Sequence, residues 1–165
     1  MSVRTPWKHE DDAVVDRPPY HYLGCGLDDV YLANGYEIHE TAYGTGVRIT
    51  NLDELHDEIG RYVVHNKKVL NAKEIRFLRH QMDVTQAELA HLMGYDSQSI
   101  ARFEKGKTRL LGPADRMLRI LFEDHLENRV STRELLEALD RRDDQSSAGV
   151  VFEDINGRWE FSSAA

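Results

Sequence analysis

Polar and basic side chains between residues 97 and 105 have the types and the spacing of a contact with nucleic acid. Gln98 and Arg102 are one helical turn apart, and Ser97 and Lys105 lie on or near the same side of a helix through this segment. In the major groove of DNA, a glutamine amide can bond an adenine edge and an arginine guanidinium a guanine edge, each through two hydrogen bonds. The segment therefore predicts direct contact with bases.

Positive charge is concentrated around this segment in a chain that is acidic as a whole. The 165 residues carry a formal net charge of -8, yet residues 97–119 contain six Lys and Arg side chains against two acidic ones. Lys107 and Arg109 follow Gly106, where we expect the helix to end, and they would attract DNA phosphates without regard to sequence. Acidic residues cluster elsewhere, where they can repel DNA from other faces; these clusters are 10–12, 53–58 and 140–144.

Histidine and cysteine side chains offer a second, weaker kind of chemistry. His21 and Cys25, with His39 or His9, could be assembled into a metal site, but the CxxC and HxxxH spacings typical of zinc ligands are absent. Cys25 could also act as a nucleophile, yet no orienting third group or oxyanion loop accompanies it. We therefore expect no metal, no cofactor and no catalytic residue, and we expect that the chain is not an enzyme.

Local capping signals delimit the helices that would position the base-contacting side chains. Thr85 and Glu88 have the spacing of a capping box, which predicts a helix beginning at Gln86 with free backbone N–H groups that suit a phosphate. Gly94 lies just past the end of this helix, where glycine turns without penalty. Asp96 can then cap the next helix. The pattern is a capped helix, a glycine turn and a second capped helix.

The helix that follows Asp96 should have an apolar face and a polar face. Ile100 and Phe103 fall on the apolar face, opposite the side chains that could contact bases. Glu104 lies within the basic stretch, and we expect it to be a structural partner of a neighbouring Lys or Arg. An alternative is that the polar residues form an ordinary solvated surface. This alternative explains Lys105, Lys107 or Arg109 taken singly. It explains less well why a capped helix, a glycine turn and a capped basic helix occur in that order.

At this point the segments TQAELA and GYDSQSIARFEKG, within residues 75–121, resemble the Cro/CI-type (Xre) family of helix-turn-helix regulators. The resemblance implies that Gln86 holds a phosphate and that Ser97, Gln98 and Arg102 face the major groove. The complete set of expected DNA-binding residues is Gln86, Ser97, Gln98, Ser99, Arg102, Lys105, Lys107 and Arg109.

The rest of the chain predicts an α+β fold with sheet elements on both sides of the helices. Residues 1–19, polar and with three prolines, are expected to be a flexible arm. Residues 71–142 should form a five-helix domain, whose fifth helix begins at Ser131. Residues 149–161 should form a β-hairpin around Asn156-Gly157 that packs on the body or pairs with another chain.

Residues 20–65 are expected to form a small β/α module. Strands 30–33 and 36–41 should pair through a two-residue turn at Asn34-Gly35, and residues 47–50 should add a third strand. Thr50 or Asn51 would cap the helix that ends the module. A sheet module ahead of such a DNA-binding domain resembles the MqsA-like antitoxins. Those antitoxins carry two CxxC pairs for zinc there, whereas this chain has only Cys25, so we expect no structural zinc.

These observations favour a sequence-specific transcriptional regulator that represses its own operon. One such helix contacts few base pairs, so we expect a homodimer on double-stranded DNA with a palindromic operator. Two alternatives stay open: an antitoxin that neutralises a partner toxin and autoregulates its operon, and a ligand-responsive regulator whose β module senses a small molecule. No apolar run approaches the roughly 18 residues of a membrane helix, and no secretion signal is recognised, so a cytoplasmic location is expected.

Overall fold

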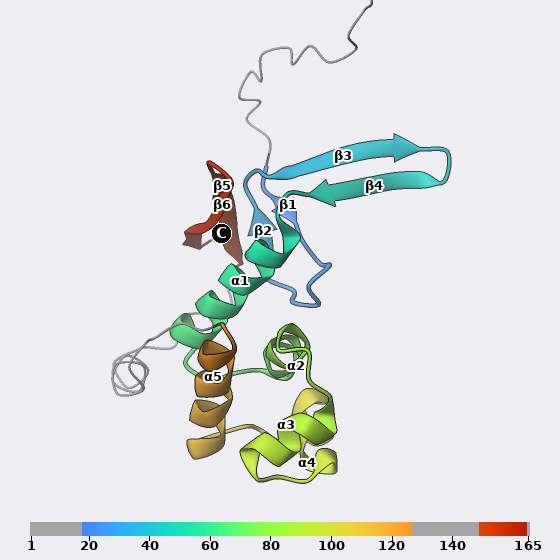
Figure 1. Ribbon diagram of the computed structural model, residues 1–165. Helices are drawn as coiled ribbons and strands as arrows, with labels where there is room; N and C mark the ends of the chain where they lie inside the picture. The colour runs from blue at the N-terminus through green and yellow to red at the C-terminus, as the bar shows by residue number, and fades with distance from the viewer. Residues whose placement is uncertain (1–17, 127–148, 165) are drawn as a thin grey trace, which may run out of the picture.

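The computed structural model describes residues 18–126 and 149–164, which form an α+β fold in which one long helix joins small sheets to a group of shorter helices (Figure 1). The strands are β1 (Tyr20–His21), β2 (Val30–Leu32), β3 (Tyr36–Thr41), β4 (Gly44–Ile49), β5 (Val150–Ile155) and β6 (Arg158–Ala164). The helices are α1 (Leu52–Asn66), α2 (Ala72–Gln81), α3 (Gln86–Met93), α4 (Ser97–Glu104) and α5 (Pro113–His125).

Strands from the two ends of the described chain form one sheet. Its order is β1-β2-β5-β6, with β2 parallel to β5 and the other two pairs antiparallel. The expected hairpin around Asn156-Gly157 is β5 and β6, and both turn residues have the positive φ, 57° and 82°, that a tight hairpin turn requires. Leu32 and Phe152 are paired across β2 and β5 and are fully buried. The hairpin therefore packs on the body of the same chain.

The predicted pairing of strands 30–33 and 36–41 is wrong. The structure places β2 between β1 and β5, and β3 pairs with β4 instead. Gly35 does adopt a positive φ of 72°, but the Asn34 amide donates to the carbonyl of Asp154 at 3.1 Å, and the ring of Trp159 covers Gly35 closely. These contacts direct the Asn-Gly segment against the C-terminal hairpin, so it does not form a two-residue reversal.

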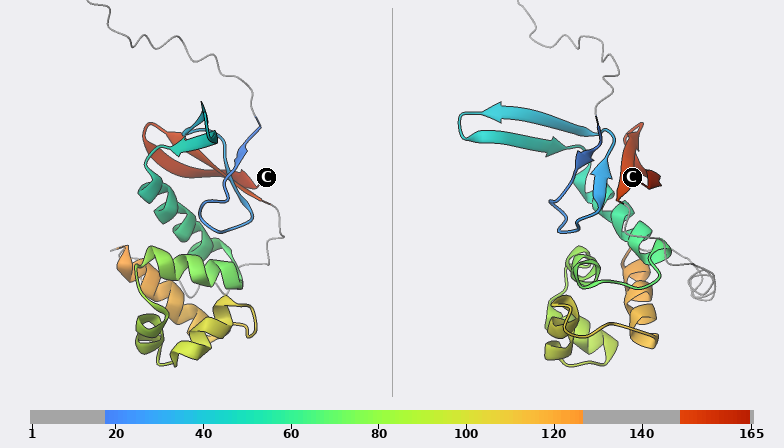
Figure 2. Two further views of the ribbon diagram at one scale, coloured as in Figure 1. Left: turned by 90° about the vertical axis from the view of Figure 1, so that its right-hand side faces the viewer. Right: turned by 180° about the vertical axis from the view of Figure 1, so that it is seen from behind.

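The β3–β4 hairpin extends away from the rest of the molecule (Figures 1 and 2). Six residue pairs join its two strands, from Tyr36↔Ile49 to Thr41↔Gly44. Most of its side chains are exposed, among them the apolar residues Ile38, Val47 and, at the tip, Tyr43. No other strand of the described chain pairs with it.

The residues just before α1 are hydrogen-bonded to the C-terminal hairpin. Asn51 occupies the N-cap position, but its side chain makes no capping bond and donates to the carbonyl of Gly157 at 3.0 Å, so the predicted side-chain cap is wrong. The Trp159 indole N–H donates to the carbonyl of Thr50 at 2.8 Å. Leu55, Ile59 and Val63 follow one another at helical spacing and are buried, whereas Leu52 at the start of the helix is exposed.

The contact between α1 and α5 contains a buried arginine. Arg119 pairs with Asp115 through Nε at 2.8 Å, and its Nη1 donates to the carbonyl of Val64 at 2.5 Å near the end of α1. A helix C-terminus leaves carbonyls without partners inside the helix, and a cation satisfies them well. Arg119 is one of the six basic residues counted above in residues 97–119. Because it is fully buried, it adds no positive charge to the exposed surface there.

Two expectations cannot be compared with the fold. The helix predicted to begin at Ser131 and residues 1–17 of the predicted arm lie outside the described residues. Among the helices that are described, none has the length and apolar character needed to cross a membrane.

Candidate nucleic-acid interface

Helix α3 begins at the predicted capping box. The Thr85 hydroxyl accepts from the Glu88 N–H at 3.2 Å, and the Glu88 carboxylate accepts from the Thr85 N–H at 2.7 Å. The bond from the Thr85 N–H lowers the pKa of the Glu88 carboxyl below its ordinary value, because it favours the carboxylate. The capping box fixes the first turn of α3 and therefore the position of Gln86, its first residue.

The turn between α3 and α4 depends on one glycine. Gly94 adopts φ 73° and ψ 28°, and the next N–H, of Tyr95, donates to the carbonyl of Ala90 at 2.8 Å. Asp96 then caps α4 by accepting from the Ser99 N–H at 2.9 Å, and this bond lowers the pKa of the Asp96 carboxyl. The glycine turn and the cap are both confirmed. They set the direction in which α4 leaves α3.

Helix α4 has the predicted two faces. Ile100 and Phe103 are buried, and the ring of Phe103 meets that of Tyr95 edge-on at 5.6 Å. Successive helical residues are turned by about 100°, so the opposite side is an arc of about 140°. That arc carries Ser97, Gln98, Ala101, Arg102 and Lys105. All of these except the half-buried Ala101 are exposed, and this set is called the α4 outer face below.

An ion pair at the C-terminal end of α4 holds this helix to α2. Arg79 donates through Nε to Glu104 Oε1 at 2.5 Å and through Nη2 to Oε2 at 3.2 Å. Its Nη1 also bonds the carbonyl of Val84 in the α2–α3 turn at 2.9 Å. Only 10% of the Arg79 side chain and 4% of the Glu104 side chain are exposed. The structural role expected for Glu104 is confirmed, with a partner on α2.

The electrostatics of this ion pair favour the charged form of Glu104. Burial raises the pKa of its carboxyl, but hydrogen bonds from Arg79 and from Gln86 together outweigh burial, so the pKa lies below its ordinary value. No sequence pattern singled out Arg79. The only hint in the sequence is that Glu104 is an acidic residue within a basic stretch and therefore needs a basic partner. This hint does not say which Lys or Arg is the partner.

Two of the expected DNA-binding residues have partners within the protein. The Gln86 amide donates to Glu104 Oε2 at 2.8 Å, and the residue is half-buried. Ser99 donates its hydroxyl to Asp96 Oδ2 at 2.9 Å and is also half-buried. Gln86 keeps its carbonyl oxygen and a second amide proton for another partner. Ser99 instead serves the cap of α4.

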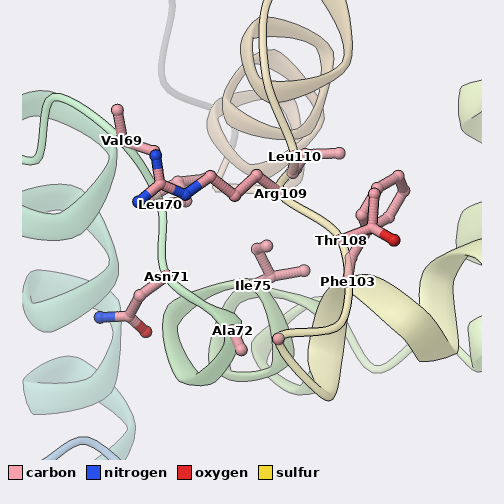
Figure 3. A pocket seen from close by; sticks show the side chains of 10 residues that line it. Val69, Leu70, Asn71, Ala72, Ile75, Phe103, Thr108, Arg109 and Leu110 are labelled. Carbon is pink, nitrogen blue, oxygen red and sulfur yellow. The ribbon is translucent and has the colours of Figure 1, made fainter.

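The loop after α4 places its two basic residues differently. Gly106, at φ 67°, follows the helix end, and Lys107 and Arg109 are both exposed. Arg109 extends its guanidinium toward Val69 and Leu70 across a groove of about 370 Å³ (Figure 3). The groove lies between this loop and the start of α2. Arg109 therefore lines the groove, whereas Lys107 does not and follows the α4 outer face directly in sequence.

Of the residues considered for metal or nucleophilic chemistry, His9 lies outside the described residues, and the other three each have a different partner. His21 bonds the carbonyl of Asp28 at 2.7 Å, His39 lies 3.3 Å from Glu37, and the Cys25 thiol donates to the carbonyl of Tyr22 at 3.8 Å. Burial raises the pKa of Cys25, which disfavours a thiolate. No group of three or more His, Cys, Asp or Glu side chains suited to a metal ion occurs in residues 18–126 and 149–164.

Comparison of the chain with models of protein families, with curated proteins and with solved structures gives no significant match.

Proposed function

We propose that this chain is a sequence-specific DNA-binding regulator of transcription, in which α3 and α4 act as a helix-turn-helix and α4 enters the major groove. The proposal includes a homodimer that represses its own operon from a palindromic operator. The observation that carries it is the α4 outer face, on which polar and basic side chains are exposed while the opposite side is buried.

The side chains of this face are available for a partner. Within residues 18–126 and 149–164, no hydrogen bond or ion pair involves the side chain of Gln98 or Arg102, whereas Glu104, at the edge of the outer face, is bonded to Arg79 and Gln86. An exposed glutamine and arginine one turn apart match the donor and acceptor patterns of adenine and guanine edges. Lys105 and Lys107 supply positive charge next to them, which suits phosphates.

The ion pair of Arg79 and Glu104 supports the same proposal. A helix that contacts bases must be held within a fraction of an ångström, because each bidentate bond depends on its orientation. The pair fixes α4 to α2 at the edge of the outer face, near the C-terminal end of α4. The cap at Asp96 and the turn at Gly94 fix its other end.

Binding of the purified full chain to its own upstream DNA tests the proposal. Fluorescence anisotropy would compare the upstream duplex with a scrambled duplex of the same length and composition, each at two salt concentrations. We expect tighter binding to the upstream duplex, with affinity that falls steeply as salt rises because each phosphate contact releases counterions. Equal affinity for the two duplexes would refute sequence-specific binding. Sedimentation of the protein with and without the duplex would test the dimer.

The projecting β3–β4 hairpin favours a second candidate function, that of an antitoxin that binds a toxin protein. Apolar side chains on its surface, Ile38, Tyr43 and Val47, are exposed, and the outer edges of its strands have no neighbour among the described strands. A free strand edge can receive a strand of another protein. Coexpression with the product of an adjacent gene tests this function. Rescue of growth by the wild type but not by Ile38→Asp would support it, and equal rescue would count against the hairpin.

A further inference from the structure

A second cavity, of about 380 Å³, lies between the sheet module and α2. One wall is the loop of Gly24, Cys25 and Gly26, which extends from the sheet toward α2 (Figure 1). The other residues that line it are His56, Lys73, Arg76, Phe77, His80 and Gln81. Sites for small molecules have volumes of roughly 300–1,000 Å³ and combine an apolar lining with a few polar groups. The volume and the lining of this cavity fall within that description.

The α2 wall of the cavity is basic. Lys73, Arg76 and His80 are three and four residues apart, so they follow one another along one side of the helix. Lys73 is paired with Asp28 at 2.5 Å, but both side chains are more than half exposed, so this pair can exchange partners. Within residues 18–126 and 149–164, no ion pair involves Arg76. Its guanidinium is therefore a cation without a carboxylate partner in the described chain.

No carboxylate is among the described lining residues, although Asp28 bonds Lys73 from outside the lining. Neither Asp nor Glu lines the cavity, and burial keeps the Cys25 thiol protonated by raising its pKa. His80 accepts from Arg79 at 3.2 Å through Nε2, so a neutral imidazole there carries its proton on Nδ1 and can donate it. Burial and the neighbouring arginines lower the pKa of His80, which favours this neutral form.

His56, the α1 residue that lines the cavity, is held in place by hydrogen bonds on both sides of its ring. The ring of His56 is bonded on both nitrogens, to the Tyr22 hydroxyl at 2.8 Å and to the Gln81 amide at 3.4 Å. Burial lowers the pKa of His56, so the imidazole is neutral, accepting from Gln81 and donating to Tyr22. The ring also meets Phe77 edge-on at 6.0 Å. A cavity whose walls are fixed in this way loses little entropy when a ligand binds.

We propose that this cavity binds a small anion that carries a carboxylate or a phosphate group, with Arg76 as its principal partner and His80 and Lys73 as further donors. A guanidinium presents two parallel N–H groups that match either group. These residues lie on α2, which also carries Arg79. His80 directly follows Arg79, so the site is next to the ion pair of Arg79 and Glu104 that holds α4.

Isothermal titration calorimetry on the purified full chain, without DNA, tests this site. Inorganic phosphate and succinate are titrated separately into the wild type, Arg76→Ala, Arg76→Lys and the matched control Arg158→Ala. Arg158 is exposed on β6 and does not line the cavity. Far-UV circular dichroism of each variant verifies its fold. The absence of DNA makes the result independent of the proposed function.

We expect one saturable site per chain for at least one of the two probes, and the probe that binds identifies the group. Arg76→Ala should weaken it by about tenfold or more, since a hydrogen bond to a charged group is worth about 1.5–3 kcal/mol. Arg76→Lys should weaken it less, and Arg158→Ala should leave it unchanged. Failure of both probes to saturate the wild type, or equal weakening by Arg76→Ala and Arg158→Ala, would overturn the proposal.

Discussion

Replacement of Glu104 by alanine tests how strongly the ion pair with Arg79 holds α2 and α4 together. The substitution leaves Arg79, whose side chain is only 10% exposed, without its carboxylate partner, and it removes the acceptor of the Gln86 amide. Loss of a hydrogen bond to a charged group costs about 1.5–3 kcal/mol, and breaking a buried pair by removing one partner costs about 3–5 kcal/mol. Arg79 keeps its bond to the carbonyl of Val84, so we expect a loss of about 2–4 kcal/mol in the free energy of unfolding.

Equilibrium unfolding in urea at pH 7, followed by far-UV circular dichroism, measures this loss. The matched control is Glu160→Ala, an exposed glutamate on β6, which should change the free energy of unfolding by less than about 0.5 kcal/mol. A change for Glu104→Ala no larger than that of Glu160→Ala would refute the reasoning. So would a double variant Arg79→Ala/Glu104→Ala whose loss equals the sum of the two single losses, since partners in direct contact should be coupled.

The same pair predicts how the loss depends on pH. The pKa of Glu104 in the folded protein lies below its ordinary value of 4.5, because the bonds from Arg79 and Gln86 outweigh burial. A carboxyl with a lowered folded pKa contributes stability above its unfolded pKa and loses it as pH falls through the folded pKa. The difference in unfolding free energy between the wild type and Glu104→Ala should therefore be constant near neutrality and should shrink below about pH 4.5.

Two further predictions concern the contacts of α1, one with α5 and the other with the C-terminal hairpin. Gly60→Ala should lower the free energy of unfolding by about 1–3 kcal/mol, because a methyl group there would overlap the ring of Phe122, whereas Gly46→Ala, with nothing closer than 3.8 Å, should have little effect. Trp159→Ala should cost about 3–5 kcal/mol through loss of the packed indole and its bond to Thr50, while Tyr43→Ala at the exposed hairpin tip should cost less than about 0.5 kcal/mol. Urea unfolding of each pair measures the effects, and similar losses within a pair would contradict the packing described.

The sequence predicted those features that depend on nearby residues. The capping box of Thr85 and Glu88, the turn at Gly94 and the cap at Asp96 each involve residues within a few positions, and all occur as expected. The buried and exposed faces of α4 also follow from helical spacing, so the candidate interface could be outlined before the fold was known.

Features that depend on distant residues were not predictable in the same way. Asn34-Gly35 has the composition of a hairpin turn, but its partners are Asp154 and Trp159, about 120 residues away in the chain. A count of charges placed Arg119 in a basic surface stretch, and only the packing of α5 on α1 buries it. The cavity beside Arg76 is formed by a loop and a helix that no local pattern brings together.

The most direct test of the central claim, that α4 contacts bases, compares Arg102→Ala with Lys107→Ala on the upstream duplex and on the scrambled duplex. Arg102→Ala should cost about 1–3 kcal/mol on the upstream duplex and much less on the scrambled one, because a bidentate bond to a base is lost. Lys107→Ala should weaken binding to both duplexes about equally, as loss of a phosphate contact does. Equal losses on the two duplexes for Arg102→Ala would contradict the claim.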